Sequence, residues 1–452
     1  MRPRQWGSTF TSLKEREYAW YFAGNLAFFM GMQMQMILRG YLAYDMTGTA
    51  ASLGWIAASM ALPMLLAAPF GGVVADRVNK RTLLIVTQVI AAVASLLLAF
   101  LILADLIRFW HLVAISLGTG IVFSFNMPAR QALVPELVPQ HKLMNAISLQ
   151  MGGMNVTRIV APAAGAMLIA PMGVGWVYML TTAMFVVAVA SEFHLPTAGM
   201  VSQVERKAFS QDFTAGFRYI AKEPTIRLLM TAALVMPLFG FPLQQMLPVF
   251  AKDVFDSPEI GLGLLGAAAG VGGLAGAMIS ANLDNQPAKG RLMFIGGLLM
   301  GGFLIAFAAS PNLLVAMFFL AAMGVGQMLF QATNNTTIQS KVPPEVRGRV
   351  MSIMMMSFGL MPLGVVPVTI AADHIGPEAS IAISAACLLV VLFLMWGASP
   401  RLRNLNVAAL GRAELSPVRA AELVAQGKLT QDEADRMTGQ VRNRGTSPVA
   451  GG

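Results

Sequence analysis

Charge and cysteine are both scarce in this chain of 452 residues. Asp, Glu, Lys and Arg together make up 12% of the sequence, about half of the ~25% that is typical of soluble domains. A single cysteine, Cys387, excludes an intramolecular disulfide framework and a cysteine-rich metal site. The four histidines are scattered and form no H-x-x-H pair. These shortages argue against a soluble globule, a disulfide-stabilised secreted scaffold and a zinc enzyme.

Catalytic and nucleotide-binding patterns are missing as well. The sequence has no G-x-x-x-x-G-K-[ST] loop, which disfavours ATP as a source of energy. It has no acid pair, Ser/His arrangement or metal constellation of the kind that an intramembrane enzyme needs. The formal charge of +9 lies in short clusters between apolar runs, not in basic stripes beside aromatics as in nucleic-acid-binding proteins. We therefore expect no enzymatic activity, no cofactor and no nucleic-acid partner.

Long apolar stretches dominate what remains. Hydrophobic residues make up 56% of the chain, and the mean hydropathy is +0.66. A helix needs about 20 mainly apolar residues to cross ~30 Å of hydrocarbon. The sequence therefore predicts an all-α polytopic membrane protein with twelve transmembrane helices. The predicted spans lie near residues 18–44, 51–75, 82–104, 110–129, 144–170, 174–195, 226–251, 259–283, 291–310, 312–337, 348–372 and 378–397.

The positions of lysine and arginine predict the orientation of these spans, because cytoplasmic loops are enriched in both. With the N-terminus inside, 27 of the 31 cations fall in predicted cytoplasmic segments, and Arg130 is counted there, in the loop between the fourth and fifth spans. Arg108 and Lys252 fall outside, and Arg39 and Arg158 lie within spans. We therefore expect both termini to be cytoplasmic.

A polar segment divides the chain near its middle. It contains an amphipathic stretch from Phe209 to Ile220. A local pattern around Pro139 recurs around Pro343, at an offset of 204 residues. Two six-span halves related in this way are typical of a transporter with parallel repeats. We predict a cytoplasmic N-tail (1–17), an N-terminal six-helix bundle (18–195), a cytoplasmic linker with an amphipathic helix (196–225), a C-terminal six-helix bundle (226–398) and a cytoplasmic polar tail (399–452).

The tail differs in character from the spans. Ser416-Pro417 is typical of a helix start, and Thr430-Gln431-Asp432-Glu433 is typical of a capping box. We expect a short pair of polar helices. Two roles stay open: a solvated tail without activity, and a segment for regulation or assembly.

The loop between the second and third spans carries a motif. It reads Gly72-Val73-Val74-Ala75-Asp76-Arg77-Val78-Asn79-Lys80-Arg81. This resembles the G-x-x-x-D-R-x-G-R/K-R signature of the major facilitator superfamily, with Asn79 at the second glycine. Because asparagine tolerates a left-handed backbone better than most residues, we expect the turn to be kept. The resemblance implies a conformational switch, whose residues are Gly72, Asp76, Arg77, Lys80 and Arg81; the alternative is that the three cations only set the orientation.

A second phrase narrows the resemblance. Pro128-Ala129-Arg130-Gln131-Ala132-Leu133-Val134-Pro135-Glu136-Leu137-Val138-Pro139, followed by Asn145-Ala146-Ile147-Ser148, is similar to the enterobactin-exporter-like and macrolide-efflux-like members. The resemblance covers residues 18 to about 400. It implies the fold of the superfamily and a monomer in the bacterial inner membrane that exports amphipathic drugs, siderophores or metabolites by proton-coupled alternating access. An importer, a lipid flippase and a non-transporting membrane sensor remain the alternatives.

The fifth span contains Ala161-Pro162-Ala163-Ala164-Gly165-Ala166. This segment is similar to the antiporter motif of the superfamily, G-P-x-x-G-G, with alanine at two glycine positions. The motif residues are Ala161, Pro162 and Gly165, and the resemblance implies export. Small residues also allow close packing of membrane helices without any directional meaning, and that alternative stays open.

Charged residues inside the predicted spans are few and informative. An intramembrane arginine costs on the order of several kcal/mol unless it faces a cavity or a partner. Arg39 and Arg158 are therefore candidates for an anion-binding or conformational-lock cation that faces the interior. The alternative is that each side chain only snorkels to the surface, which is easier for Arg39 near the outer end of its span than for Arg158, ~22 Å into its span. Every acid falls in a loop, a tail or at a span end, and Asp45 and Asp373 are the proton candidates.

The resemblance implies that the first, fourth, seventh and tenth spans line the substrate cavity. These spans are rich in methionine and amides, and methionine adapts to varied substrate shapes. The spacing of three tenth-span amides places them on one helical face. Contacts between helices are the alternative use of such amides. The cavity candidates are Asn25, Gln33, Arg39, Asn126, Arg158, Phe241, Gln245, Gln327, Gln331 and Asn334.

The motif generates a first testable prediction. An anionic Asp76 at a cytoplasmic helix end can meet the positive N-terminus of another helix in one conformer only. Asp76→Asn should therefore abolish substrate flux while the amount of protein inserted in the membrane stays unchanged. Transport assays and quantitative membrane immunoblots measure the two quantities, and full transport by the variant would remove the switch role.

Overall fold

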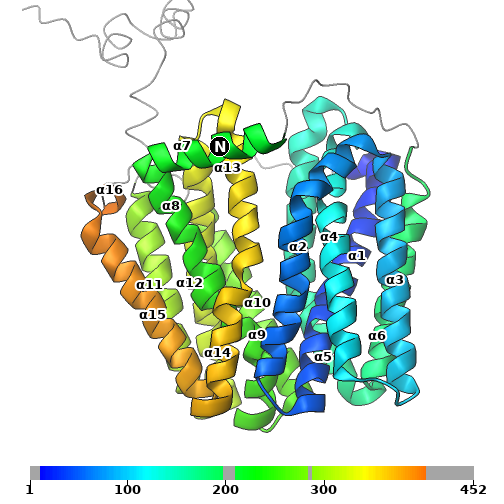
Figure 1. Cartoon of the computed structure of the whole chain (residues 1–452), viewed down its shortest axis with the longest axis vertical. Coiled ribbons are helices and arrows are strands. Elements are labelled where there is room, and N and C mark those ends of the chain that lie inside the picture. The colour runs from blue at the N-terminus through cyan, green and yellow to red at the C-terminus, as the bar shows by residue number, and fades with distance from the viewer. Residues whose placement is uncertain (1–10, 197–208, 284–287, 404–452) are drawn as a thin grey trace, which may run out of the picture.

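The computed structural model describes residues 11–196, 209–283 and 288–403, which form helices joined by short connections (Figure 1). The predicted class, an all-α polytopic membrane protein, is confirmed. Nine helices in the described part are long and apolar enough to cross a membrane. Two shorter apolar stretches also occur: Ala51–Ala67, which is part of the longer helix Ala51–Arg77, and Pro362–Ile375. The predicted number of twelve crossings therefore stays a prediction.

The first half of the chain forms a set of long helices after a short 3₁₀ turn, η2 (Thr11–Lys14). Its helices are α1 (Arg16–Thr47), α2 (Ala51–Arg77), α3 (Lys80–Leu103), α4 (Phe109–Leu137), α5 (Leu143–Met172) and α6 (Val174–Glu192), with a 3₁₀ turn η3 (Gln140–Lys142) before α5.

The second half follows the linker helix α7 (Phe209–Lys222) and is more interrupted. Two of its rod-like units are built from several pieces in direct succession. The first of them, the seventh unit of the chain, consists of α8 (Pro224–Val235), η4 (Met236–Gly240), α9 (Phe241–Val249) and η5 (Phe250–Val254). The second, the eleventh unit, consists of α13 (Pro344–Met356), η6 (Ser357–Leu360) and α14 (Pro362–Ile375). The other elements are α10 (Pro258–Asn282), α11 (Lys289–Ala308), α12 (Leu313–Lys341), α15 (Pro377–Ala398) and α16 (Pro400–Arg403).

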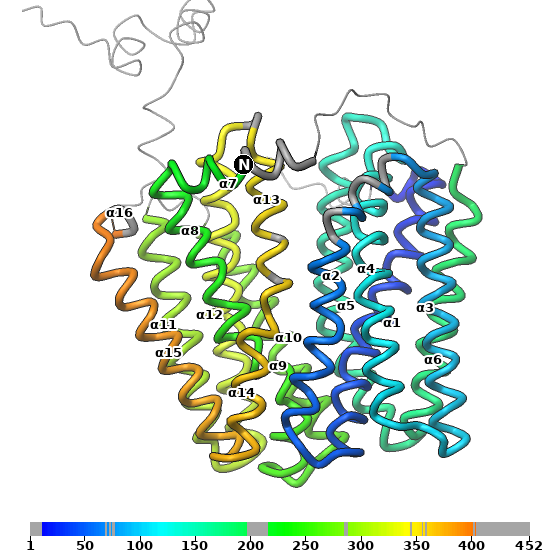
Figure 2. Tube along the Cα trace, in the orientation of Figure 1, coloured from blue at the N-terminus to red at the C-terminus, as the bar shows by residue number. Residues whose placement is uncertain are grey.

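The helices lie in two groups (Figure 2). In the first group α1 packs against α5 and α6, α2 against α4, and α3 against α4 and α6. In the second group α12 packs against α10 and α11, and α15 against α11 and α14. Helix α7 lies crosswise over one end of the second group, where it packs against α13. We call this end of the molecule the linker end, and the opposite end, which holds the connection between α1 and α2, the hinge end.

The two groups repeat one another in detail. Helix α12 begins and ends 204 residues after α4, and both helices have 29 residues. Gly173 joins α5 to α6 with φ 78° and ψ 156°, and Gly376 joins α14 to α15 with φ 87° and ψ 154°. Only glycine adopts such a positive φ without a steric penalty. A glycine with the same backbone conformation therefore ends α5 in the first half and α14 in the second half.

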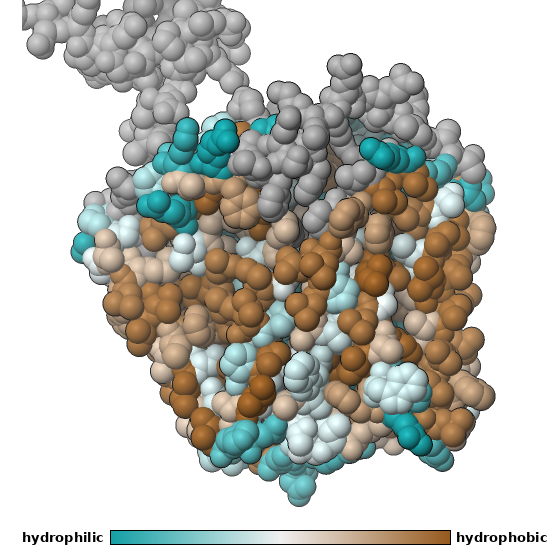
Figure 3. Space-filling model, in the orientation of Figure 1, coloured by the Kyte–Doolittle hydropathy of each residue, from teal (hydrophilic) through white to brown (hydrophobic). Residues whose placement is uncertain are grey.

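On the face shown in Figure 3, large apolar side chains dominate the middle, and hydrophilic ones gather towards both ends. Phe100 on α3, Leu314 on α12 and Leu394 on α15 are 62%, 77% and 64% exposed. An exposed apolar surface of this extent is costly in water. It matches a belt that faces lipid, in which helices satisfy their own backbone hydrogen bonds.

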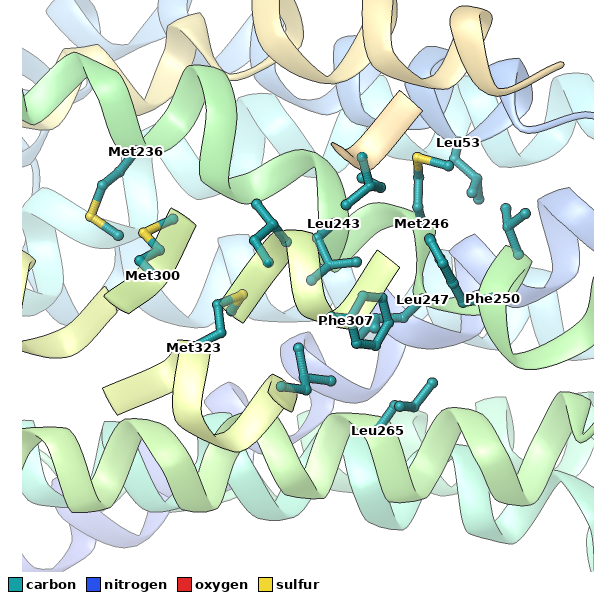
Figure 4. Packing of buried hydrophobic residues seen from close by; sticks show 14 of the residues in the cluster. Leu53, Met236, Leu243, Met246, Leu247, Phe250, Leu265, Met300, Phe307 and Met323 are labelled. Atoms are coloured by element: carbon teal, nitrogen blue, oxygen red, sulfur yellow. The ribbon is translucent and has the colours of Figure 1, made fainter. Parts of the chain in front are cut away.

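The interior of the second group is filled with methionine, leucine and phenylalanine (Figure 4). Phe250 and Phe307 pack with their ring centroids 4.9 Å apart. The π-helical turn η4 contains Pro237, and α9 contains Pro242 and Pro248. Proline lacks the N–H that a regular helix needs and clashes with the preceding turn, which accounts for the broken seventh unit.

Contact between the two groups depends on small residues. A side chain at Gly54 of α2 would lie 2.4 Å from Thr369 Oγ1 of α14, and one at Gly270 of α10 would lie 2.5 Å from Ile159 Cγ2 of α5. Helices α2 and α14, and α5 and α10, therefore approach more closely than larger residues allow. The contact of Gly54 lies near the hinge end, and the contact of Gly270 lies at the middle of α10.

The structure corrects two sequence-based expectations. Arg130 does not belong to a loop: α4 extends to Leu137, and Arg130 is buried within it. Asn79 does not adopt the left-handed conformation; its φ is −57°, and its side chain caps α3 by accepting from the Thr82 N–H. The predicted tail helices lie outside the described residues.

The packing of α2 on α4 generates a testable prediction. A Cβ atom at Gly120 would lie 2.1 Å from the Met60 carbonyl oxygen, whereas one at Gly118 would meet nothing within 4 Å. Gly120→Leu should lower the thermal unfolding temperature in detergent because α4 would be pushed away from α2. Gly118→Leu, on the same helix, is the matched control, and an equal effect of both variants would contradict this packing.

Candidate functional site

A cavity of about 430 Å³ lies between the two groups of helices. Residues of α1, α2, α4 and α5 from the first group and of α9, α10 and α12 from the second group line it. The volume lies within the ~300–1,000 Å³ that is usual for small-molecule pockets. A site formed by both groups changes shape when the groups move relative to one another.

Many of the predicted cavity residues do reach this space. They come from four different helices and include both arginines that lie in the predicted spans. The predicted residues that line the cavity are Gln33, Arg39, Arg158, Phe241, Gln245, Gln327 and Gln331. The structure establishes their position, and their contact with a substrate stays a prediction.

One polar lining residue was missed by the sequence reasoning: Asn155 lies three positions before Arg158 on α5. Gln244, beside Gln245 on α9, also lines the cavity, as expected for the amides of the seventh span. The spacing from Asn155 to Arg158 was a usable signal, because residues three apart share a helix face. Glycines of α10 also line the cavity. The methionines of the lining are Met32, Met36, Met60, Met64, Met328 and Met361.

Arg39 is almost fully buried, with 3% of its surface exposed. Its guanidinium donates to Gln35 Oε1 at 2.7 Å and to Ser116 Oγ at 3.3 Å. Its Nε has no hydrogen-bond partner among the described residues. Arg39 is therefore positioned by neutral groups at the cavity wall and does not extend to the surface, which removes the alternative that it only snorkels outward.

Arg158 faces the same cavity from α5. Its side chain keeps accessible surface although α5 packs against α1 and α10 at this level. Within the described part of the chain its guanidinium takes part in no hydrogen bond and no ion pair. Since a guanidinium has five N–H donors, Arg158 offers its full donor set to the cavity.

The cavity holds no acid to balance these two cations. No aspartate or glutamate is among the described residues that line it. Its polar lining consists otherwise of the amides of glutamine and asparagine. The cavity is therefore a region of positive potential inside an apolar protein, where charges interact more strongly than in water.

Asn25 and Asn126, predicted for the cavity, lie elsewhere. Both are fully buried and accept hydrogen bonds from Arg130, at 2.9 Å for Asn25 Oδ1 and 3.1 Å for Asn126 Oδ1. The Arg130 guanidinium also lies 4.4 Å from the ring centre of Phe28. These contacts tie α1 to α4. Asn334, the third amide of the tenth-span face, is buried and does not line the cavity.

Glu192 completes the network around Arg130. Its Oε1 lies 3.5 Å from Arg130 Nη2 and accepts a hydrogen bond from Gln88. Glu192 is 1% exposed, the lowest exposure of any acid in the described residues. The sequence analysis placed it at a span end and did not anticipate its burial. The ion pair joins α4 to α6, and the hydrogen bond from Gln88 adds α3, in the half of the molecule nearer the linker end.

The antiporter-like segment lies where three helices meet. Ala161 is fully buried, and Pro162 lines the cavity. A Cβ atom at Gly165 would lie 3.4 Å from Met34 Cγ of α1. A Cβ atom at Gly266 of α10 would lie 3.7 Å from Pro162 Cβ. The segment therefore packs closely against α1 of its own group at Gly165 and against α10 of the second group at Pro162, and a directional role stays a prediction.

The loop motif is described only in part. Gly72 and the side chain of Asp76 are not among what the structure describes, so their predicted switch role stays a prediction. Arg77 is exposed. Lys80 pairs with Glu136 of α4, and Arg81 donates to the carbonyl oxygens of Glu192 and Phe193 at 3.1 and 2.7 Å. These last two cations hold α3 to neighbouring helices of the same group, beyond any effect on orientation.

The proton candidates lie at the hinge end and away from the cavity lining. Asp373 of α14 accepts from the N–H groups of Ala50 and Ala51, at 2.6 and 3.0 Å. Asp45 pairs with Lys252 at 2.6 Å. A carboxylate at a helix N-terminus is stabilised by the helix dipole, so Asp373 fastens the start of α2 to the second group.

Two tyrosines of α1 extend this contact. Tyr41 donates to Glu259 Oε1 at 2.9 Å, and Tyr44 donates to Asp253. Together with the contacts of Asp45 and Asp373, these interactions form what we call the hinge-end latch. The hydrogen bonds and ion pairs that join described residues of the two groups all lie in this latch.

Comparison with known proteins gives the family. The family described as transmembrane secretion effector matches residues 7–426. The staphyloferrin A transporter of Staphylococcus aureus is 22% identical over 386 residues, which cover 83% of this chain and 95% of that protein. Macrolide efflux protein A of Streptococcus pyogenes is 23% identical over 351 residues, which cover 76% of this chain and 86% of that protein.

A solved structure supports the fold. The crystal structure of a mutant of the nucleoside transporter NupG superposes with a TM-score of 0.71 at 12% identity, and the match covers 84% of this chain and 99% of that chain. At this identity the similarity shows the arrangement of helices alone.

The buried pair generates a testable prediction. Glu192→Gln removes the charge that balances Arg130, and breaking one side of a buried ion pair costs roughly 3–5 kcal/mol. The midpoint of thermal unfolding in detergent should fall clearly. The matched control is Glu136→Gln, which removes the partner of the more exposed Lys80 and should cost about 0–1 kcal/mol. Equal shifts for both variants would contradict a structural role of the Arg130 network.

Proposed function

Because the chain belongs to the transmembrane secretion effector family of the major facilitator superfamily, we propose that it exports amphipathic small molecules by alternating access. It is a multi-pass membrane transporter and not an enzyme. The observation that carries the proposal is the position of the cavity, which lies between two repeated groups of helices whose polar contacts gather at one end.

The mechanism follows from that position. When the hinge-end latch is formed, α2 and α14 close the hinge end of the cavity. When the latch breaks, the two groups can separate at the hinge end while the linker-end parts of α2 and α14 and of their neighbours approach one another. A substrate bound to both groups is then exposed to the two sides of the membrane in turn.

We place the linker end in the cytoplasm and the hinge end outside, in a bacterial plasma membrane. The support is the distribution of lysine and arginine. The placement of Arg130 within α4 moves one of the 27 cations out of a loop, and the asymmetry towards the linker end remains. The transporter then works as a monomer with both termini in the cytoplasm.

Proton coupling is part of the proposal. Its candidate residues are Asp45 and Asp373, which lie at the outer surface in this orientation and hold the latch through Lys252 and the N-terminus of α2. The names of the relatives, a siderophore transporter and a macrolide efflux protein, support efflux of drugs, siderophores or metabolites over import, lipid flipping or sensing without transport.

The test is a substrate screen on a susceptible host. Cells that express the protein should survive higher concentrations of its substrates, and inside-out vesicles should accumulate them. A protonophore should abolish both effects. Resistance that survives collapse of the proton gradient would contradict proton antiport, and uptake by intact cells would show an importer. A correctly folded protein that transports none of the compounds screened would favour the alternative of a membrane sensor without transport.

A further inference from the structure

The charges of the cavity carry information about what binds in it. Arg39 and Arg158 reach it, and no acid is among its described lining residues. Three other cations of the first group have anionic partners: Arg130 pairs with Glu192, Lys142 with Glu15 and Lys80 with Glu136. The two arginines at the cavity have no such partner among its described lining residues.

Arg158 is the less satisfied of the two. Arg39 is held by Gln35 and Ser116, whereas Arg158 makes no hydrogen bond or ion pair within the described part of the chain. A guanidinium that faces a cavity within the membrane and has no partner is unfavourable compared with a paired one. It becomes favourable when an anion completes it, and its planar fork matches a carboxylate through two parallel hydrogen bonds.

The remaining lining fits the rest of such a ligand. Amides from α1, α5, α9 and α12 offer both donors and acceptors. Methionines and three phenylalanines, Phe29, Phe123 and Phe241, provide an apolar surface of adaptable shape. A molecule with one anionic group and an apolar body uses all three kinds of lining.

We propose that the cavity takes amphipathic organic anions, with the carboxylate of the ligand bound to Arg158 and its apolar body against the methionines and phenylalanines. This inference rests on the proposed transport function and names its substrate class. Amphipathic cations are disfavoured because they would meet two positive charges and no carboxylate. The volume of about 430 Å³ suits a drug-sized acid.

The experiment measures equilibrium binding to the purified full-length protein in nanodiscs. The probes are radiolabelled 2-naphthoate and 2-naphthylmethylammonium, which share an aromatic body and differ in charge. The wild type should prefer the anion. Arg158→Gln should weaken naphthoate binding by about tenfold or more, as expected for loss of a charge-assisted hydrogen bond. Arg158→Lys keeps the charge but loses the planar fork, so it should bind naphthoate more weakly than the wild type and still prefer the anion. Arg291→Gln removes an exposed arginine outside the cavity lining and should change nothing.

The outcomes separate this inference from the proposed function, because binding is measured without transport. Equal affinity for both probes, or naphthoate binding that Arg158→Gln leaves intact, would overturn the anion site even if vesicles export a substrate. The site for organic anions would also be overturned if dioctanoyl phosphatidylglycerol displaced labelled naphthoate at concentrations far below those at which unlabelled naphthoate does so. That result would favour a lipid headgroup as the ligand. Arg158→Lys keeps the test valid if Arg158→Gln does not fold, since loss of the preference for the anion in a folded, charged variant would equally contradict the proposal.

Discussion

The contact between the Asp373 carboxylate and the first N–H groups of α2 is the interaction on which the arrangement of the two groups depends. It joins α14 to α2 at the place where Gly54 lets these helices touch. Helix N-termini have unsatisfied N–H groups that attract anions, so the bond forms without a dedicated side-chain partner. It can also break without leaving a buried charge, because the hinge end is accessible to water. This combination suits a contact that forms in one state of a transporter and opens in the other.

The same electrostatic rule explains why the arginines of the spans differ. Arg130 is paired with Glu192 and surrounded by amides, so it is part of the rigid frame of the first group. Arg39 is held by neutral groups at the wall of the cavity. Arg158 has accessible surface in the cavity and no described partner. The more completely a cation is paired, the more structural its role, and the least paired one marks the place where a ligand is required.

Much of the fold could be predicted from the sequence because membrane helices obey simple rules of length and hydropathy. The offset of 204 residues, read from Pro139 and Pro343, recurs in the bounds of α4 and α12. The site was harder to predict. The sequence places Asn25 and Asn126 on their helices, but only the rotation of those helices decides whether they face the cavity or pack against their neighbours. Arg130 was expected in a loop, because the sequence does not show that α4 extends to Leu137. The burial of Glu192 depends on Gln88 and Arg130 from other helices, which periodicity within one segment cannot reveal.

The central claim is that the two groups move relative to one another by opening the latch. Spin labels on Thr49→Cys and Ile260→Cys, both exposed positions on opposite sides of the hinge-end latch, report this directly in a Cys387→Ser background by double electron–electron resonance. The account predicts one short distance for the intact latch. It predicts a second, longer population when Asp373→Ala and Lys252→Ala are introduced together. A single unchanged distance distribution in the variant would contradict the account.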